Sequence, residues 1–128
     1  MTLLLDTAAF LWWVTGSPRL SKGAREALTD PGNDVFLSAV SAWEIALKHA
    51  LGKLPLPEEP ETLLPRLRSA HRVEELPLSE AAALQLPKLP PLHRDPFDRM
   101  LVCQAIVHGM TLVTSDPPLR RYPVRALW

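Results

Sequence analysis

Short apolar runs alternate with longer amphipathic stretches along the whole chain, and this alternation restricts the fold more than any other feature. The runs that we expect to form strands are residues 3–5, 34–37, 73–76, 111–114 and, at an edge, 124–127. Helical spacing of apolar residues is found over 8–14, 21 to about 30, about 39–51, about 61–70 (where Pro65 must start or kink the helix), 79–86 and about 96–108. Strands that alternate with helices indicate a parallel sheet. We therefore predict a three-layer α/β/α fold with a central, mostly parallel sheet of about four to five strands.

Length and composition fit one compact domain, residues 1–128. Fourteen basic residues balance fourteen acidic ones, so any contact with nucleic acid must come from a local patch rather than from bulk charge. The single cysteine, Cys103, excludes an intramolecular disulfide and a cysteine-based zinc finger, and it suits the reducing cytoplasm. The apolar N-terminal stretch has no basic leader and is interrupted by Asp6, so we expect neither export nor a membrane span.

Two aspartates follow predicted strands. Asp6 comes directly after LLL, and Asp116 comes after TLVTS with Pro117 in the favoured first position of a helix. Each one alone is explained as the N-cap of a helix. Two aspartates that end parallel strands also point into the same crevice, where ligands of such sheets collect. Both interpretations, cap and ligand, remain open for each residue.

Glu44 lies on a helical stripe with Val40, Leu47 and Leu51, which places a carboxylate in the middle of a face predicted to be buried. An ionised group there costs several kcal/mol unless it is paired or bound to a cation. One explanation is structural: a buried salt bridge to an arginine, a side chain that snorkels from the edge of the face, or a salt bridge to Lys48 one helical turn further on. The other explanation is a functional role.

Asp98 shows the same anomaly, on a stripe with Leu101, Val102 and Ala105. The helix dipole would stabilise a carboxylate in this first turn by only tenths of a kcal/mol to about 1 kcal/mol. That is too little to explain a carboxylate directed at the core, so we predict that Asp98 is a ligand. Its neighbour Asp95 precedes Pro96 and is explained as a helix cap, with a supporting place in the site.

Asp6, Glu44, Asp98 and Asp116 would repel one another strongly in a shared crevice, and a divalent cation would resolve this repulsion. The donors are all oxygen atoms, which favours Mg²⁺ or Mn²⁺ over zinc. Such a metal can activate a water molecule and neutralise charge on a phosphodiester. The chemistry that these residues indicate is therefore phosphodiester hydrolysis.

The order of LLLDT, SAWEIALK, DPFDRMLVCQA and TSD resembles the PIN-domain nucleases, and among them the VapC-type toxins of bacterial and archaeal toxin–antitoxin pairs. The resemblance covers nearly the whole chain. It implies an endoribonuclease dependent on Mg²⁺ or Mn²⁺, usually a homodimer, which a cognate antitoxin holds inactive. The family's acidic quartet then falls on Asp6, Glu44, Asp98 and Asp116, and its small hydroxyl residue on Thr114, with Ser115 as the alternative.

Basic residues flank the acids and could together grip RNA phosphates, although each alone fits a solvated rim. They are His93, Arg94 and Arg99 before and around Asp98, and Arg120, Arg121 and Arg125 after Asp116. The tryptophans Trp12, Trp13 and Trp43 lie on apolar helices, which is typical of core or dimer contacts.

Two other functions compete with a nuclease. One is a non-catalytic PIN-like module that binds nucleic acid or protein. The other is a receiver-like signalling domain that binds Mg²⁺, which would need a pair of acids at the first strand and a lysine after a late strand. Neither of those features is present in the sequence.

Overall fold

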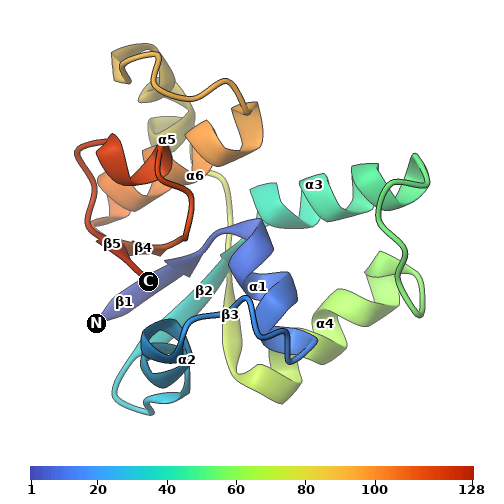
Figure 1. The fold of residues 1–128 in the computed structure, drawn as a ribbon. Coiled ribbons are helices and arrows are strands. Elements are labelled where there is room, and N and C mark those ends of the chain that lie inside the picture. Colours follow the sequence, from blue (N-terminus) through green and yellow to red (C-terminus); the bar gives the residue numbers. More distant parts are fainter.

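The computed structural model describes all 128 residues and contains one sheet of five parallel strands. The strands are β1 (Thr2–Leu5), β2 (Asp34–Ser38), β3 (Val73–Leu76), β4 (Thr111–Val113) and β5 (Ala126–Leu127), in the order β3-β2-β1-β4-β5 (Figure 1). The prediction of a central, mostly parallel sheet is confirmed, and the sheet is parallel throughout.

Every predicted helix is present, with ends that differ from the prediction by one or a few residues. The helices are α1 (Thr7–Val14), α2 (Lys22–Thr29), α3 (Ala39–Ala50), α4 (Pro60–His71), α5 (Glu80–Leu84) and α6 (Pro96–His108), with 3₁₀ turns η1 (Leu86–Lys88) and η2 (Leu119–Arg121). Pro65 lies inside α4, because that helix already begins at Pro60. No helix has both the length and the apolar character needed to cross a membrane.

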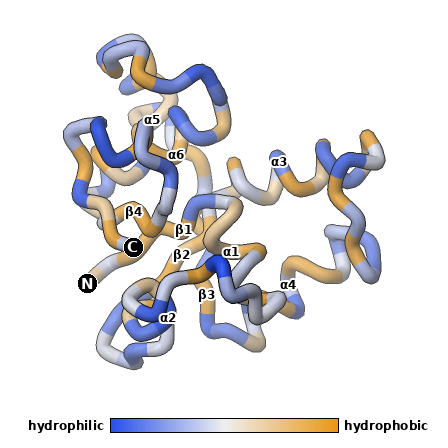
Figure 2. The backbone as a smooth tube through the Cα atoms, viewed as in Figure 1, coloured by the Kyte–Doolittle hydropathy of each residue, from blue (hydrophilic) through white to orange (hydrophobic).

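The central strand β1 explains the run of three leucines near the N-terminus. Leu3 and Leu5 point into one hydrophobic core, beneath α1, α2 and α4, and Leu4 points into the second, beneath α6. A strand covered on both faces is apolar along its whole length rather than alternating, and Figure 2 shows the central strands in the hydrophobic colours. The α/β/α layering follows from these two cores.

Helices start immediately after strands at two places. Asp6 ends β1 and caps α1, and Ser38 is the last residue of β2 and caps α3. The side chain of Ser38 also bonds to Gln104 of α6, which ties the sheet to that helix. These abrupt junctions hold the first turns of α1 and α3 at the carboxyl edge of the sheet.

The strand order creates a switch point beside β1. The chain adds β2 and β3 on one side of β1, and later adds β4 and β5 on the other side. The carboxyl ends of β1 and β4 therefore border the crevice in which ligands of doubly wound sheets bind. Receiver domains have the order 2-1-3-4-5, so this sheet argues against the receiver-like alternative.

Helix α3 corrects one expectation from the sequence. Val40 and Glu44 are buried as predicted, but Leu47 and Leu51 are 41% and 59% exposed. The first half of α3 packs against neighbouring helices, whereas its second half extends beyond the sheet (Figure 1). Trp43 is likewise 60% exposed, with one edge against Phe97 of α6, so it is not a core residue.

Candidate active site

Asp6 is buried at the end of β1 and serves as a helix cap. Its Oδ1 accepts a hydrogen bond of 2.7 Å from the backbone N–H of Ala9. Burial raises the pKa of Asp6; hydrogen bonds from Thr114 and Ala9 oppose this rise, and the charges of Asp116 and Glu44 add to it. The cap interpretation is thus confirmed, and the same carboxylate also interacts with the charges of Asp116 and Glu44.

Glu44 lies in the buried half of α3, with a side chain only 6% exposed. One of its oxygens pairs with Lys48, as the spacing predicts, and this hydrogen bond raises the pKa of Lys48. The other oxygen, Oε1, is buried and has no hydrogen-bond partner. A buried carboxylate oxygen without a partner is costly, so Oε1 of Glu44 is suited to bind a cation or a water molecule held by one.

Asp98 lies in the first turn of α6 with its side chain 20% exposed. Burial, and then the negative charges of Asp95, Asp6 and Glu44, raise the pKa of Asp98 to about 7, although His93 lowers it. No arginine or lysine forms a salt bridge with Asp98. The carboxylate is therefore held among other acids without a lysine or arginine partner, which is the anomaly that the sequence indicated.

Asp95 begins α6. Its Oδ1 accepts hydrogen bonds from the backbone N–H groups of Phe97 and Asp98, at 2.9 and 3.2 Å. The prediction that Asp95 is a cap is confirmed. Because this carboxylate is engaged in the cap, Asp98 rather than Asp95 is free to face the crevice.

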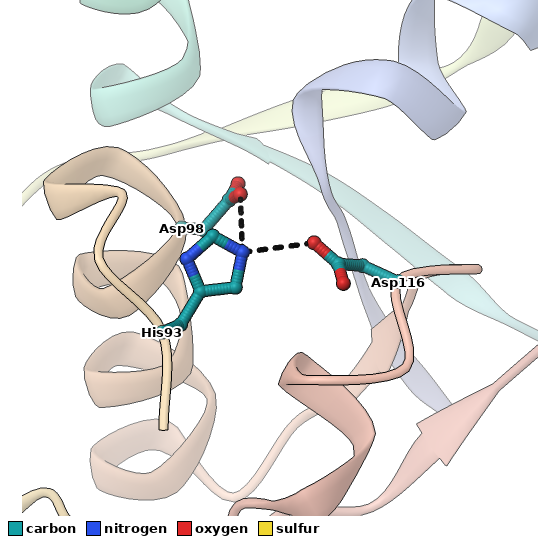
Figure 3. A group of neighbouring side chains, drawn as sticks. All are labelled: His93, Asp98 and Asp116. Atoms are coloured by element: carbon teal, nitrogen blue, oxygen red, sulfur yellow. Dashed lines mark hydrogen bonds and ion pairs between the residues drawn. The ribbon is translucent and has the colours of Figure 1, made fainter. Parts of the chain in front are cut away.

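Asp116 follows β4 and does not cap a helix, which corrects the cap interpretation of this residue. Its Oδ2 lies 2.9 Å from Nε2 of His93, and the same nitrogen lies 3.5 Å from Oδ2 of Asp98 (Figure 3). The His93, Asp98 and Asp116 side chains each offer one donor atom within 4.8 Å of the others. These three residues form the tightest part of the site.

His93 is the site residue that sequence reasoning missed, because it was grouped with the basic rim. It lies in the proline-rich loop before α6, where no helical or strand periodicity predicts the direction of a side chain. The only signal was its place two residues before the Asp95 cap. Figure 3 shows the ring between Asp98 and Asp116.

Thr114 is fully buried at the end of β4 and contributes its hydroxyl to the site. The hydroxyl oxygen accepts a hydrogen bond of 3.1 Å from the backbone N–H of Asp116. Hydrogen bonding by Thr114 also lowers the pKa of Asp6. The structure thus connects Thr114, and not the half-buried Ser115, with two of the acids.

The four acids come from different parts of the chain and interact at one edge of the sheet. Asp6 interacts with Glu44 and Asp116, and Asp98 interacts with Asp6 and Glu44. Like charges at this burial disfavour the ionised forms. Together with the unpartnered Oε1 of Glu44, an all-oxygen donor set fits a hard divalent cation. The residues present therefore fit a metal centre.

The basic residues are distributed unevenly around this edge. Arg94, Arg120 and Arg121 are exposed in the segments that adjoin His93 and Asp116. Arg99 is half-buried on α6, and its Nε has no partner. Arg125 precedes β5 and so lies toward the amino ends of the strands, which removes it from the predicted rim.

The surface hollows do not all coincide with the acids. One hollow lies at the amino edge of the sheet, where it is lined by residues such as Asp34, Arg72 and Glu74. A smaller hollow borders the acidic edge and is lined by Thr7, Glu44 and Lys48. We assign the candidate active site to the hollow at the acidic edge, because buried acids interact there at the carboxyl ends of parallel strands.

The parallel α/β/α fold and the buried acids at its switch point together identify the protein as an α/β protein whose site is suited to a cation. The PIN domain family model matches residues 3–124, so the chain belongs to the PIN domain family. PIN-domain nucleases generally depend on divalent metal ions, and the acidic cluster agrees with this dependence.

Two curated relatives from Mycobacterium tuberculosis are named ribonucleases. Ribonuclease VapC22 is 33% identical over 121 residues, which cover 94% of this chain and 92% of the relative. Ribonuclease VapC16 is 46% identical over 52 residues, but that match spans only 38% of this chain and 37% of the relative.

Solved structures share the fold at lower identity. VapBC2 from Rickettsia felis, bound to a promoter DNA fragment, aligns with a TM-score of 0.74 and 19% identity over 98% of this chain and 97% of that chain. DNA-bound VapBC from Salmonella typhimurium aligns with a TM-score of 0.69 and 20% identity, over 98% and 96% of the two chains. At this identity the likeness concerns the fold.

Proposed function

We propose that this protein is a metal-dependent endoribonuclease and the toxin of a type II toxin–antitoxin pair. The observation that carries the proposal is the meeting of Asp6, Glu44, Asp98 and Asp116 at the switch point, in a chain of the PIN domain family. A relative that matches along nearly the whole chain is named a ribonuclease. The substrate class that we assign is therefore RNA.

The acids divide the work by their positions. Asp6, Asp98 and Asp116 would hold Mg²⁺ or Mn²⁺ from the central strand ends and α6, and Glu44, whose Oε1 has no partner, interacts with Asp6 and Asp98 from α3. The bound ion supplies an activated water molecule and neutralises charge on the phosphodiester. Lys48 keeps the second oxygen of Glu44 in place, which leaves Oε1 as the available donor. Thr114 fixes the backbone of Asp116.

The exposed arginines give the site its affinity for RNA. Arg94, Arg120 and Arg121 adjoin the acids and can contact phosphates, and the half-buried Arg99 lies next to Asp98. Contacts with phosphates release counterions, so binding should weaken as salt concentration rises. This local patch supplies the interaction that a net charge of zero does not.

The partners that we infer are a cognate antitoxin and a second copy of the chain. The related folds were solved as VapBC assemblies, some of them bound to DNA. Trp43 and Leu47 of α3, and Leu51 directly after it, are exposed and give an apolar surface for such a contact. Because the substrate is RNA, we place its action in the cytoplasm.

A cleavage assay tests the proposal. Purified protein is incubated with total RNA in the presence of Mg²⁺, Mn²⁺ or EDTA. We expect cleavage with either metal and none with EDTA. Asp98→Asn should lower the rate by at least about 100-fold, since losses of 10–100-fold already follow the removal of groups that only orient metal ligands.

The matched control is Asp34→Asn, which removes an exposed aspartate at the amino end of β2 and should leave the rate unchanged. Full activity of Asp98→Asn would remove the assignment of the acids. Metal-independent binding of RNA without cleavage would instead favour a non-catalytic binding module.

A further inference from the structure

The imidazole of His93 lies among the acids, yet the proposed chemistry gives it no part. Its Nε2 lies 2.9 Å from Oδ2 of Asp116 and 3.5 Å from Oδ2 of Asp98 (Figure 3). An imidazole nitrogen in that place can bind a metal ion through a lone pair, or it can donate an N–H to the carboxylates. It cannot do both at once, because the same nitrogen carries either the lone pair or the proton.

The hydrogen bond at Nδ1, the other ring nitrogen, shows whether Nε2 carries a lone pair or a proton. The backbone N–H of Asp95 donates to Nδ1 of His93 at 2.9 Å. A nitrogen that accepts an N–H carries no proton, so the ring proton of this tautomer sits on Nε2. The ring therefore presents a donor, and not a lone pair, to Asp98 and Asp116.

The group that sets the tautomer is itself fixed. The carboxylate of Asp95 caps α6 through the N–H groups of Phe97 and Asp98, which holds the Asp95 backbone at the helix start. The backbone N–H of His93 donates to the hydroxyl of the buried Tyr122 at 3.0 Å. The ring is thus held both at its own backbone and through Nδ1.

Metal-binding histidines show the opposite arrangement. Their second ring nitrogen donates to a carboxylate, a carbonyl or a water, which leaves the lone pair on the nitrogen that faces the metal. In this protein the second nitrogen faces a donor instead. Although His93, Asp98 and Asp116 lie close enough to share an ion, the histidine is in the wrong tautomer to be a ligand.

Taking the proposed function as given, we propose that His93 is a positioning residue that donates Nε2–H to Asp116, and more weakly to Asp98, and does not bind the metal. His93 is the one side-chain hydrogen-bond partner of the Asp116 carboxylate. Its hydrogen bond occupies Oδ2 of Asp116 and directs the remaining oxygen toward the ion. Asp116 caps no helix, so without His93 its carboxylate is free to rotate. The metal ligands are therefore all oxygen atoms, and the imidazole of His93 positions one of them without binding the ion.

The ring proton can be observed directly. Protein labelled with ¹⁵N-histidine is recorded by long-range ¹H–¹⁵N correlation without metal and at saturating Mg²⁺, and the resonances of His93 are identified by their loss in His93→Gln. We expect a protonated Nε2 and an unprotonated Nδ1 in both states. A proton on Nδ1 in the metal-free protein, or its transfer there when Mg²⁺ binds, would overturn the proposal.

Metal affinity separates positioning from ligation. Binding of Mn²⁺ alone is measured by calorimetry for the wild type, His93→Ala and His93→Gln. The alanine variant should bind about 10–100-fold more weakly, as expected for the loss of a group that orients a ligand. Glutamine places an N–H near the position of Nε2 and should restore affinity to within a few-fold. His108→Gln, an exposed histidine of α6, should match the wild type.

The proposal is overturned if His93→Ala binds Mn²⁺ like the wild type, or if His93→Gln binds as weakly as His93→Ala. Failure of the proposed function has a different signature, namely wild-type protein that binds Mn²⁺ but does not cleave RNA. In that case the tautomer and the affinity series still decide the role of His93.

Discussion

At the scale of single residues, the site contains carboxylates in surroundings that disfavour their charge. Asp98 is the clearest case, because burial and three neighbouring acids raise its pKa to about 7. Asp6 shows the same direction of shift, mainly from burial. Such shifts are typical of groups arranged for binding rather than for stability. In the metal-free protein, ionisation of these carboxylates should therefore lower the free energy of unfolding by a measurable amount.

Asp98→Asn should reveal this cost as a pH-dependent gain in stability. Asp98 takes up its proton more readily in the folded than in the unfolded chain, so the metal-free wild type loses stability as pH rises from about 4 to about 7. Asparagine does not titrate. The measurement is urea unfolding in EDTA, which gives the free energy of unfolding of Asp98→Asn minus that of the wild type. This difference should be about 1–3 kcal/mol more favourable to the variant at pH 8 than at pH 4.

A wild type that gains stability over Asp98→Asn between pH 4 and pH 8 would contradict the direction given for the pKa.

At the scale of elements, the starts and ends of helices fix the geometry of the site. Asp6, Ser38 and Asp95 each cap the helix that carries or adjoins an acid. At its other end, α6 closes at Gly109 with φ of 64°, in the left-handed region that a glycine adopts at least cost. Gly23 differs, because it lies within the first turn of α2 in ordinary helical conformation.

The same substitution should therefore have opposite effects at these two glycines. Gly109→Ala should destabilise by about 1 kcal/mol, because a Cβ would have open space but a strained backbone. Gly23→Ala should stabilise by about 0.5 kcal/mol, since its Cβ would meet the carbonyl oxygen of Trp128 at an ordinary 3.4 Å. Thermal unfolding measures both, and effects of equal sign would refute the assignment of the left-handed end.

In the whole molecule, the site consists of residues that are far apart in the sequence and become neighbours only when the chain folds. Asp6 follows β1, Glu44 lies on α3, Asp98 on α6, and Asp116 after β4. An ion bound by these residues links both layers of helices through the edge of the sheet. Such an ion binds the folded chain and has no site in the unfolded one, so binding must raise stability.

Mg²⁺ or Mn²⁺ should raise the melting temperature of the wild type in a concentration-dependent manner. At 100 times the dissociation constant the gain is about 2.7 kcal/mol, which corresponds to roughly 5–15 °C for a chain of this size. The same titration of Asp98→Asn should give a much smaller shift, and Asp34→Asn should follow the wild type. Equal shifts in all three proteins would place the ion outside the acidic cluster.

Local patterns in the sequence predicted the helices and strands, and they marked Glu44 and Asp98 as anomalous carboxylates. Strand and helix periods, and caps such as Asp95, depend on residues within a few positions of one another, so they can be read locally. Glu44 and Asp98 were visible because each interrupts an apolar stripe.

The remaining features of the fold and the site depend on tertiary contacts, which no local pattern records. The order of strands, the partner of Asp116, and the place of His93 depend on contacts between segments far apart in the chain. Periodicity also could not show that only the first half of α3 is covered by other elements, which leaves Leu47 and Leu51 in solvent. A pattern records that a face is apolar, whereas burial requires another element to cover it.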